Sequence, residues 1–265
     1  MKKARKLLKS GTAKIRINLN KKFLSLHPKL LSMYHVCRTY IKPGMRLFDL
    51  IEENPSLLLV MQHFDFDFRV GDLTVSELCK EKGINENLFI SIANLYNGFK
   101  PKENPINSVD DVKQIVRFLK NSHDYYRNDK YPQISAYIKQ LQENHPENEL
   151  KLLERFFNEY FAEVIDHLDY EDNVAFPYFI EFLGKRDNPG SNAYSAQEYS
   201  EHHTDIELKI KDIKNLLLKY VSINDDLNLR RKLLFSLCEL EYDLYIHSLI
   251  EETILIPFGY NMEKA

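Results

Sequence analysis

Two His-x-x-x-Glu motifs are the residues of this chain whose types and spacing could do chemistry. One motif is His167 with Glu171, and the other is His247 with Glu251, 80 residues later. On a helix, residues four apart lie one turn apart on the same face, so each motif can direct an imidazole and a carboxylate at one ion. Imidazole and carboxylate ligands together suit iron, manganese or zinc. The two motifs therefore predict a metal site.

The same 80-residue shift relates longer stretches around the two motifs. Each Glu is followed six residues later by a proline, Pro177 or Pro257. Each His is preceded by apolar residues at alternating spacings of three and four, which is typical of the buried face of a helix. These residues are Leu153, Phe157, Tyr160 and Val164 in one stretch and Leu233, Leu237, Leu240 and Leu244 in the other. His123 and His203 obey the shift too, and each lies 44 residues before the His of its motif. The repeat predicts two related helical hairpins.

Four His and two Glu on core-facing stripes predict a dinuclear metal site. Unpaired polar groups lose solvation in an apolar interior, and metal ions would compensate for that loss. In one arrangement the two Glu bridge the ions, while His123 and His167 cap one ion and His203 and His247 cap the other; other pairings stay open. Each ion keeps a position for a small ligand. The predicted ligands are His123, His167, Glu171, His203, His247 and Glu251, with iron preferred over manganese or zinc.

Simpler interpretations compete for each of these residues. A single His on an apolar stripe is more often a hydrogen-bonded core residue, and a single His-x-x-x-Glu pair is more often a surface pair. Neither interpretation explains the shared shift. His202 competes with His203, but only His203 continues the stripe of Tyr199, Ile206, Ile210 and Ile213.

Other His and Tyr residues give weaker signals. Solvated or capping roles are expected for His27, His35, His63 and His145. Three tyrosines are candidates to line the metal pocket, although packing is the default role in a chain with 16 Tyr; they are Tyr126, Tyr160 and Tyr178.

Four helical segments must position the ligands, and periodicity predicts them at 108–140, 147–183, 195–221 and 226–256. Breaker residues, such as Pro146 and Pro189-Gly190, separate them. Pro132 is expected to kink or end the first segment. The predicted fold is all-α, an up-down-up-down four-helix bundle over residues 108–260.

A small helical domain is predicted in front of the bundle, at residues 45–97. Thr74-Val75-Ser76-Glu77 has the pattern of a capping box, and Gly83 is placed to end the helix that it opens. A further helix should stop at Asn97-Gly98, and one or two short helices, interrupted at Pro55, should come first. Residues 98–107 are rich in helix breakers and form the predicted linker.

Composition supports helices and narrows the class of protein. Among 265 residues there are only 8 Gly and no Trp, and the long segments are rich in Leu, Ile, Lys and Glu. The three cysteines, Cys37, Cys79 and Cys238, lie far apart, so neither a disulfide framework nor a zinc knuckle is predicted. A reducing, cytoplasmic location is expected. No apolar run approaches the roughly 20 residues of a membrane span.

Residues 1–44 form a basic N-terminal extension. The first 48 residues contain 13 Lys or Arg and no Asp or Glu, although the whole chain carries a net charge of −3. Such a segment could bind nucleic acid or a membrane surface, and its lack of acids also suits a transit peptide. A solvated tail or an upstream start codon is the preferred interpretation.

The metal motifs resemble those of the hemerythrin-like proteins, and more closely those of the iron–sulfur cluster repair (repair of iron centres) family. The resemblance covers about residues 108–258. It is carried by His123, by His167-Leu-Asp-Tyr-Glu171 with Phe176-Pro177, by Glu201-His202-His203, and by His247-Ser-Leu-Ile-Glu251 with Ile256-Pro257. Four His and two Glu are similar to the ligand set of the repair proteins, whereas oxygen-carrying hemerythrins use five His with one Asp and one Glu.

Residues 45–97 resemble the small domain that precedes the bundle in the repair family. The shared features are Leu50-Ile51, Phe66-Asp67-Phe68, the Thr74 to Glu77 cap and Cys79. The family has an adjacent Cys-Cys followed by Gly, but this chain has Arg69-Val70-Gly71 after Phe68. The departure argues against a thiol-dependent step in this domain and favours a docking role.

The resemblance implies a non-haem di-iron protein that reacts with nitric oxide or oxygen species and helps to restore damaged iron centres. The implied cofactor is two iron ions with an oxo or hydroxo bridge, although manganese or zinc would also suit the ligands. The implied partners are a diatomic ligand, oxygen or nitric oxide, and iron–sulfur proteins; nucleic acid would bind only through the basic extension. The alternative is a gas or redox sensor, or a binding protein without turnover.

Overall fold

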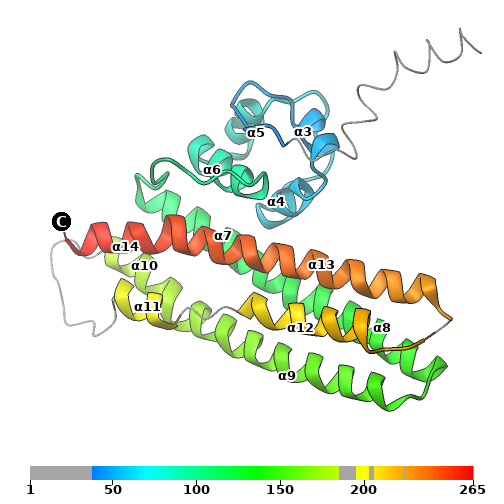
Figure 1. Ribbon diagram of the computed structural model, residues 1–265. Helices are drawn as coiled ribbons and strands as arrows, with labels where there is room; N and C mark the ends of the chain where they lie inside the picture. Colours follow the sequence, from blue (N-terminus) through cyan, green and yellow to red (C-terminus); the bar gives the residue numbers. More distant parts are fainter. Residues whose placement is uncertain (1–37, 185–194, 203–205, 224, 265) are drawn as a thin grey trace, which may run out of the picture.

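The computed structural model describes residues 38–184, 195–202, 206–223 and 225–264. The fold is all-α, as predicted, and the described residues contain no strand (Figure 1). No helix among them is long and apolar enough to cross a membrane. Several predictions fall on residues outside this description, namely those on residues 1–37 of the basic extension, with His27, His35 and Cys37, on Pro189-Gly190, and on the proposed ligand His203.

The N-terminal part is a group of four short helices. They are α3 (Leu47–Glu53), α4 (Leu57–His63), α5 (Val75–Lys82) and α6 (Glu86–Tyr96). The capping box is confirmed, because the Thr74 hydroxyl accepts the Glu77 N–H while the Glu77 carboxylate accepts the Thr74 N–H. Gly83 ends α5 in the left-handed conformation, with φ of 66°, which glycine adopts at low cost. Residues 98–107 contain no helix.

Four longer helical segments follow at the predicted places. The first is α7 (Val109–Tyr125), η1 (Tyr126–Lys130) and α8 (Tyr131–Asn144), and the second is α9 (Asn148–Tyr170), η2 (Glu171–Ala175) and α10 (Phe176–Gly184). The third contains α11 (Ala196–His202) and α12 (Ile206–Lys219), and the fourth is α13 (Leu227–Ile250), η3 (Glu251–Leu255) and α14 (Ile256–Glu263). The fourth segment continues past Pro257 and beyond its predicted end.

Within the described residues, each π-helical turn begins six residues before a proline. These turns start at Tyr126, Glu171 and Glu251, and the prolines are Pro132, Pro177 and Pro257. A proline has no N–H and its ring clashes with the carbonyl four residues earlier, so the wider π turn lets the helix pass it. Pro132 does not end the first segment, because the chain remains helical across it. Two of the turns start at the Glu of a predicted metal motif.

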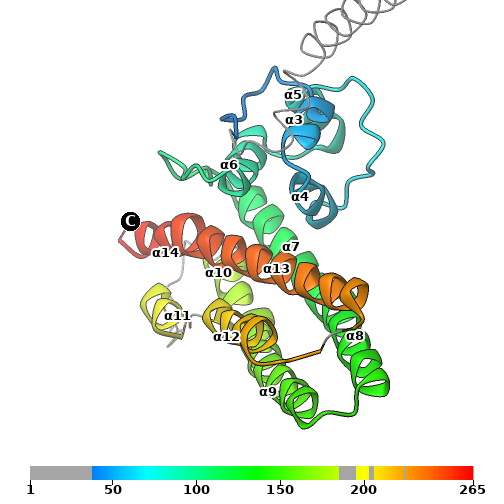
Figure 2. The ribbon, with the colours of Figure 1, turned by 45° about the vertical axis from the view of Figure 1, so that its right-hand side comes forward.

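The long segments pack side by side through their apolar faces. Helix α8 contacts α9 and α13, and α12 contacts the same two helices (Figures 1 and 2). The periodic apolar residues of both motif helices are buried, among them Leu153, Phe157, Val164, Leu233, Leu237 and Leu240. The N-terminal helices lie over α7 and α13, with α4 against α7 and α6 against α13 (Figure 2). Side chains from the long segments thus meet in a shared interior.

Candidate metal centre

Five of the six predicted ligands lie in the described part of the chain, and all five point into the interior. His123 is in the last turn of α7, His167 in the last turn of α9 and His247 in the last turn of α13. Glu171 and Glu251 are the first residues of η2 and η3 and are fully buried. The position of the two Glu at π turns matches the frequent use of such turns at functional sites.

The ligand atoms form two groups that share one residue. His123, Glu171 and His247 have ligand atoms within 4.8 Å of one another, and so do His167, Glu171 and Glu251. Glu171 Oε2 lies 3.2 Å from His123 Nε2 and 3.6 Å from His247 Nε2, whereas its Oε1 lies 2.9 Å from His167 Nε2. The two oxygens of one carboxylate therefore face different groups, as those of a bridging ligand would. His123 is grouped with His247, not with His167 as in the arrangement described from the sequence.

Tyr199 is a member of this cluster that sequence reasoning missed. Its hydroxyl donates to Glu251 Oε1 at 2.5 Å and lies 3.3 Å from Glu171 Oε1, and the side chain is fully buried. Burial raises the pKa of Tyr199, and the charges of Glu171 and Glu251 raise it further. The available signal was its place on the core stripe, one turn before His203.

Two further side chains contact the Nδ1 atoms of the imidazoles, on the side of each ring that faces away from Glu171. Asp172 Oδ1 lies 3.1 Å from His123 Nδ1, and Arg127 donates a 2.8 Å hydrogen bond to the other oxygen of Asp172. Ser122 Oγ lies 2.8 Å from His247 Nδ1. Such partners fix the ring orientation of a metal-binding His and raise its basicity. Both rings consequently direct Nε2 at Glu171.

The electrostatics of the cluster favour an anionic Glu171 in contact with imidazoles. Burial opposes ionisation of Glu171, but the nearby imidazoles of His123, His167 and His247 outweigh it and hold the pKa of Glu171 well below its usual range. Burial likewise opposes charge on His247, but Glu251 and Glu171 outweigh it and raise the pKa of His247 to about 10. The carboxylates and the imidazoles of the centre therefore stabilise each other's charged forms.

The surroundings of Glu171 Oε2 indicate whether these residues fit a metal ion. Glu171 Oε2 is buried and has no hydrogen-bond partner, although two imidazole nitrogens face it within 3.6 Å. Buried carboxylate oxygens without a donor are rare because they lose solvation without replacement. A cation between the carboxylate and the imidazoles would satisfy them together. The described residues therefore fit metal binding through nitrogen and carboxylate ligands.

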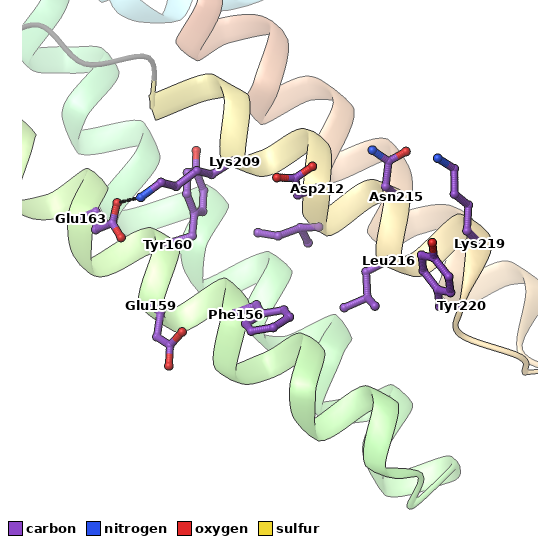
Figure 3. A pocket seen from close by; sticks show the side chains of 11 residues that line it. Phe156, Glu159, Tyr160, Glu163, Lys209, Asp212, Asn215, Leu216, Lys219 and Tyr220 are labelled. Atoms are coloured by element: carbon purple, nitrogen blue, oxygen red, sulfur yellow. Dashed lines mark hydrogen bonds and ion pairs between the residues drawn. The ribbon is translucent and has the colours of Figure 1, made fainter.

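The three tyrosines considered from the sequence have different positions. The ring of Tyr126 packs edge-on to His247, with centroids 6.0 Å apart, whereas the Tyr178 hydroxyl donates to Glu263. Tyr160 lines an open groove of about 550 Å³ between α9 and α12, where Lys209 pairs with Glu163 (Figure 3). None of the five predicted ligands that the structure describes lines this groove.

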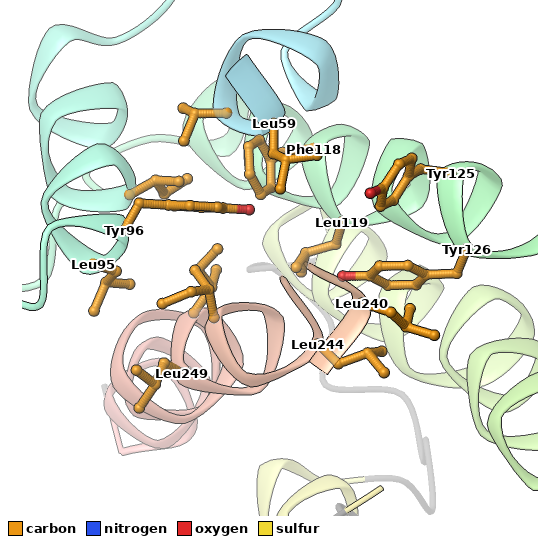
Figure 4. Close-up of a cluster of buried hydrophobic side chains, with 14 of the residues drawn as sticks. Leu59, Leu95, Tyr96, Phe118, Leu119, Tyr125, Tyr126, Leu240, Leu244 and Leu249 are labelled. Carbon is orange, nitrogen blue, oxygen red and sulfur yellow. The ribbon is translucent and has the colours of Figure 1, made fainter. Parts of the chain in front are cut away.

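A second buried His–carboxylate cluster, the junction cluster, consists of His63, Tyr96, Tyr126 and Asp243. Asp243 Oδ2 lies 2.9 Å from His63 Nε2 and accepts the Tyr126 hydroxyl at 2.9 Å, while Oδ1 accepts the Tyr96 hydroxyl at 2.5 Å. Figure 4 shows the two tyrosines reaching toward each other from α6 and η1. The expectation of a solvated or capping His63 is wrong, because its side chain is fully buried.

The charge of Asp243 is stabilised inside this cluster. Burial opposes its ionisation, but His63 and the hydroxyls of Tyr96 and Tyr126 outweigh burial and lower the pKa of Asp243 below its ordinary value. The cluster joins α4 and α6 to α13 one turn before His247. The N-terminal helices are thus attached to the helix that carries the second metal motif.

Comparison with known proteins adds no assignment to this geometry, because no protein-family model matches the chain and no curated protein matches it.

Proposed function

We propose that this chain is a non-haem di-iron protein of the iron–sulfur cluster repair type, acting on damaged iron centres or in the response to nitric oxide and oxidative stress. The observation that carries the proposal is Glu171, whose two carboxylate oxygens face two different groups of candidate ligands. The proposed role in repair of iron centres rests on the resemblance of the motifs to that family. The ligand chemistry supports iron, with manganese or zinc as other metals that the site would accept.

In the proposed centre, His123, His247 and Glu171 hold one ion, and His167, Glu171 and Glu251 hold the other. The 80-residue repeat adds His203 to the second ion. Bound iron would supply redox chemistry toward oxygen or nitric oxide. Asp172 and Ser122 keep the imidazoles in place, and the surrounding apolar side chains limit access of water.

The proposal extends to the architecture and the small domain. We infer that the four long segments form an up-down-up-down bundle of the hemerythrin type over residues 108–260, because α8, α9, α12 and α13 contact one another in a closed order. Residues 45–97 would be a separate domain that docks on this bundle through the junction cluster, and iron–sulfur proteins would be its partners.

The first experiment measures metal content by elemental analysis, together with an optical spectrum, on protein purified with iron present. We expect two irons per chain and oxo-bridge absorption in the wild type, and the loss of both in Glu171→Gln/Glu251→Gln. The matched control is Glu252→Gln, which changes the exposed neighbour of Glu251 and should leave the iron content unchanged. A wild-type chain that takes up no metal would overturn the proposal.

A second experiment tests the third long segment through the repeat. His203→Ala should lower the iron content much more than His202→Ala, because only His203 is related to His123 by the 80-residue shift. Equal loss in the two variants would show that the ligand register of this segment is wrong.

A gas or redox sensor is the second candidate function, and the junction cluster favours it. Asp243 lies one helical turn before His247 on α13 and binds side chains of the N-terminal helices. A movement of His247 at the centre would therefore be transmitted to these helices through Asp243. If the protein is a sensor, the metal state should change its affinity for a partner or for nucleic acid, and a variant without residues 1–37 is the control for binding by the basic extension. Rapid, reversible oxygenation of the reduced di-iron form would instead favour a binding protein without turnover.

A further inference from the structure

The two halves of the repeat differ at one buried position beside the metal centre. Leu119 lies one turn before His123, and the residue related to it by the 80-residue shift is Tyr199. Both side chains are fully buried. Leu119 fills this position of the first half with a purely apolar side chain. The ring of Tyr199 packs edge-on against Phe179, and its hydroxyl in addition places an oxygen atom within the centre.

The phenolic oxygen has the spacing of a ligand atom. It lies 2.5 Å from Glu251 Oε1 and 3.3 Å from Glu171 Oε1, and the latter oxygen lies 2.9 Å from His167 Nε2. Two atoms that each lie about 2.0–2.2 Å from one ion are separated by roughly 3 Å when their bonds are close to perpendicular. The phenolic oxygen therefore lies where a further atom of the second ligand group would lie.

The two ligand groups also differ in their numbers of imidazoles and carboxylates. Among the described residues, the first group has two imidazoles and one carboxylate, whereas the second has one imidazole and two carboxylates. An additional anionic oxygen would make the second position a site rich in hard ligands. Tyrosine serves as an iron ligand in haem proteins, so its oxygen is chemically suited to iron.

We propose that Tyr199 is a ligand of the second metal position, which makes the two positions chemically unequal. The inference rests on the proposed metal-binding function and deepens it. Binding of the ion would replace the phenolic O–H bond by a bond between the oxygen and the metal, and the proton would be released to solvent. No electron is transferred in this step.

The test is the optical and resonance Raman spectrum of the full-length protein loaded with ferric iron. A phenolate bound to ferric iron absorbs in the visible range, and excitation there enhances the vibrations of its ring. We expect this absorption in the wild type and its loss in Tyr199→Phe, which keeps the ring. Tyr199→Leu copies the related Leu119 and should lose it as well.

The matched control is Tyr126→Phe. Tyr126 is also fully buried and packs against His247, but its hydroxyl donates to Asp243 and not to a proposed ligand. Tyr126→Phe should therefore keep the visible band. If it loses the band as Tyr199→Phe does, the inference is overturned.

The wild-type spectrum alone can overturn the inference, so the test does not depend on whether the variants fold. Iron-loaded wild type without a phenolate band would overturn the role of Tyr199 and leave the di-iron proposal standing. A band that persists in Tyr199→Phe would have the same meaning. A wild type that takes up no iron, as seen by elemental analysis, would overturn both.

Discussion

The metal centre and the junction cluster are both buried assemblies of His and carboxylate, but they differ in how their acceptors are satisfied. In the junction cluster, both oxygens of Asp243 are paired with His63, Tyr96 or Tyr126. In the metal centre, Glu171 Oε2 has no hydrogen-bond partner. A buried carboxylate that has enough donors is complete without an ion, whereas one that lacks donors is a candidate ligand.

The difference predicts what each cluster contributes to the protein. The junction cluster should stabilise the fold whether or not metal is bound, because all its partners belong to the chain. The metal centre should contribute most of its stability only when an ion replaces the missing donors. Removal of one group from each cluster and removal of the metal can therefore separate the two roles.

The largest expected effect is that of Asp243→Ala on the metal-free protein. The substitution leaves His63 and two phenols buried without their acceptor, and loss of one partner from a buried pair costs about 3–5 kcal/mol. Urea unfolding of the metal-free protein should show this loss in the free energy of unfolding. Iron content per folded chain should stay as in the wild type. If Asp243→Ala lost iron as completely as Glu171→Ala, the two clusters would be one functional unit and the comparison would fail.

Metal removal should have the next largest effect on the free energy of unfolding. The effect should require an intact metal centre. If the proposed ion binds only the folded chain, free metal at a hundred times its dissociation constant should add about 2.7 kcal/mol to the free energy of unfolding. Thermal unfolding with and without a chelator should show this difference in the wild type and in Asp243→Asn. Glu171→Gln should show none. Equal stabilisation of Glu171→Gln by iron would place the metal elsewhere.

Helical periodicity explains how much of the centre could be predicted. Five predicted ligands come together, four of them buried and His167 half-buried, because spacings of four and shifts between related helices determine which residues face the core. Periodicity does not determine which helices face each other, so the grouping of His123 with His247 required the structure. The same limit applies to the junction cluster, in which His63 and Asp243 lie 180 residues apart.

Local rules predicted the helices better than the turns inside them. The capping box at Thr74 and the left-handed Gly83 have strong local signals, and the structure has both. The proline six residues after each Glu was visible in the repeat, but its consequence was not inferred. A helix interior disfavours proline, so Pro132 is expected to kink or end a helix. The helix instead continues across Pro132 through a π turn.

A smaller effect is expected for Asp172→Asn, which changes the support of His123 without removing a ligand. Loss of a partner behind a metal-binding His costs 10–100-fold in metal affinity, so a decrease of about tenfold is expected. Competition with a chelator would measure it. The matched control is Asp169→Asn, because Asp169 pairs with the same Arg127 but is exposed and lies away from the ligands. Equal losses in both variants would assign the effect to Arg127 and not to His123.

The smallest effect is expected in the pH dependence of the junction cluster. The pKa of Asp243 is lower in the folded protein than its ordinary value, so its ionised form stabilises the fold. This contribution is present above the unfolded pKa of about 3.9 and is lost as the pH falls toward the folded pKa. The difference in free energy of unfolding between metal-free wild type and Asp243→Asn should therefore shrink as the pH falls below 4. A difference that grew in acid would mean that the native cluster prefers a protonated Asp243, and that it lacks donors as the metal centre does.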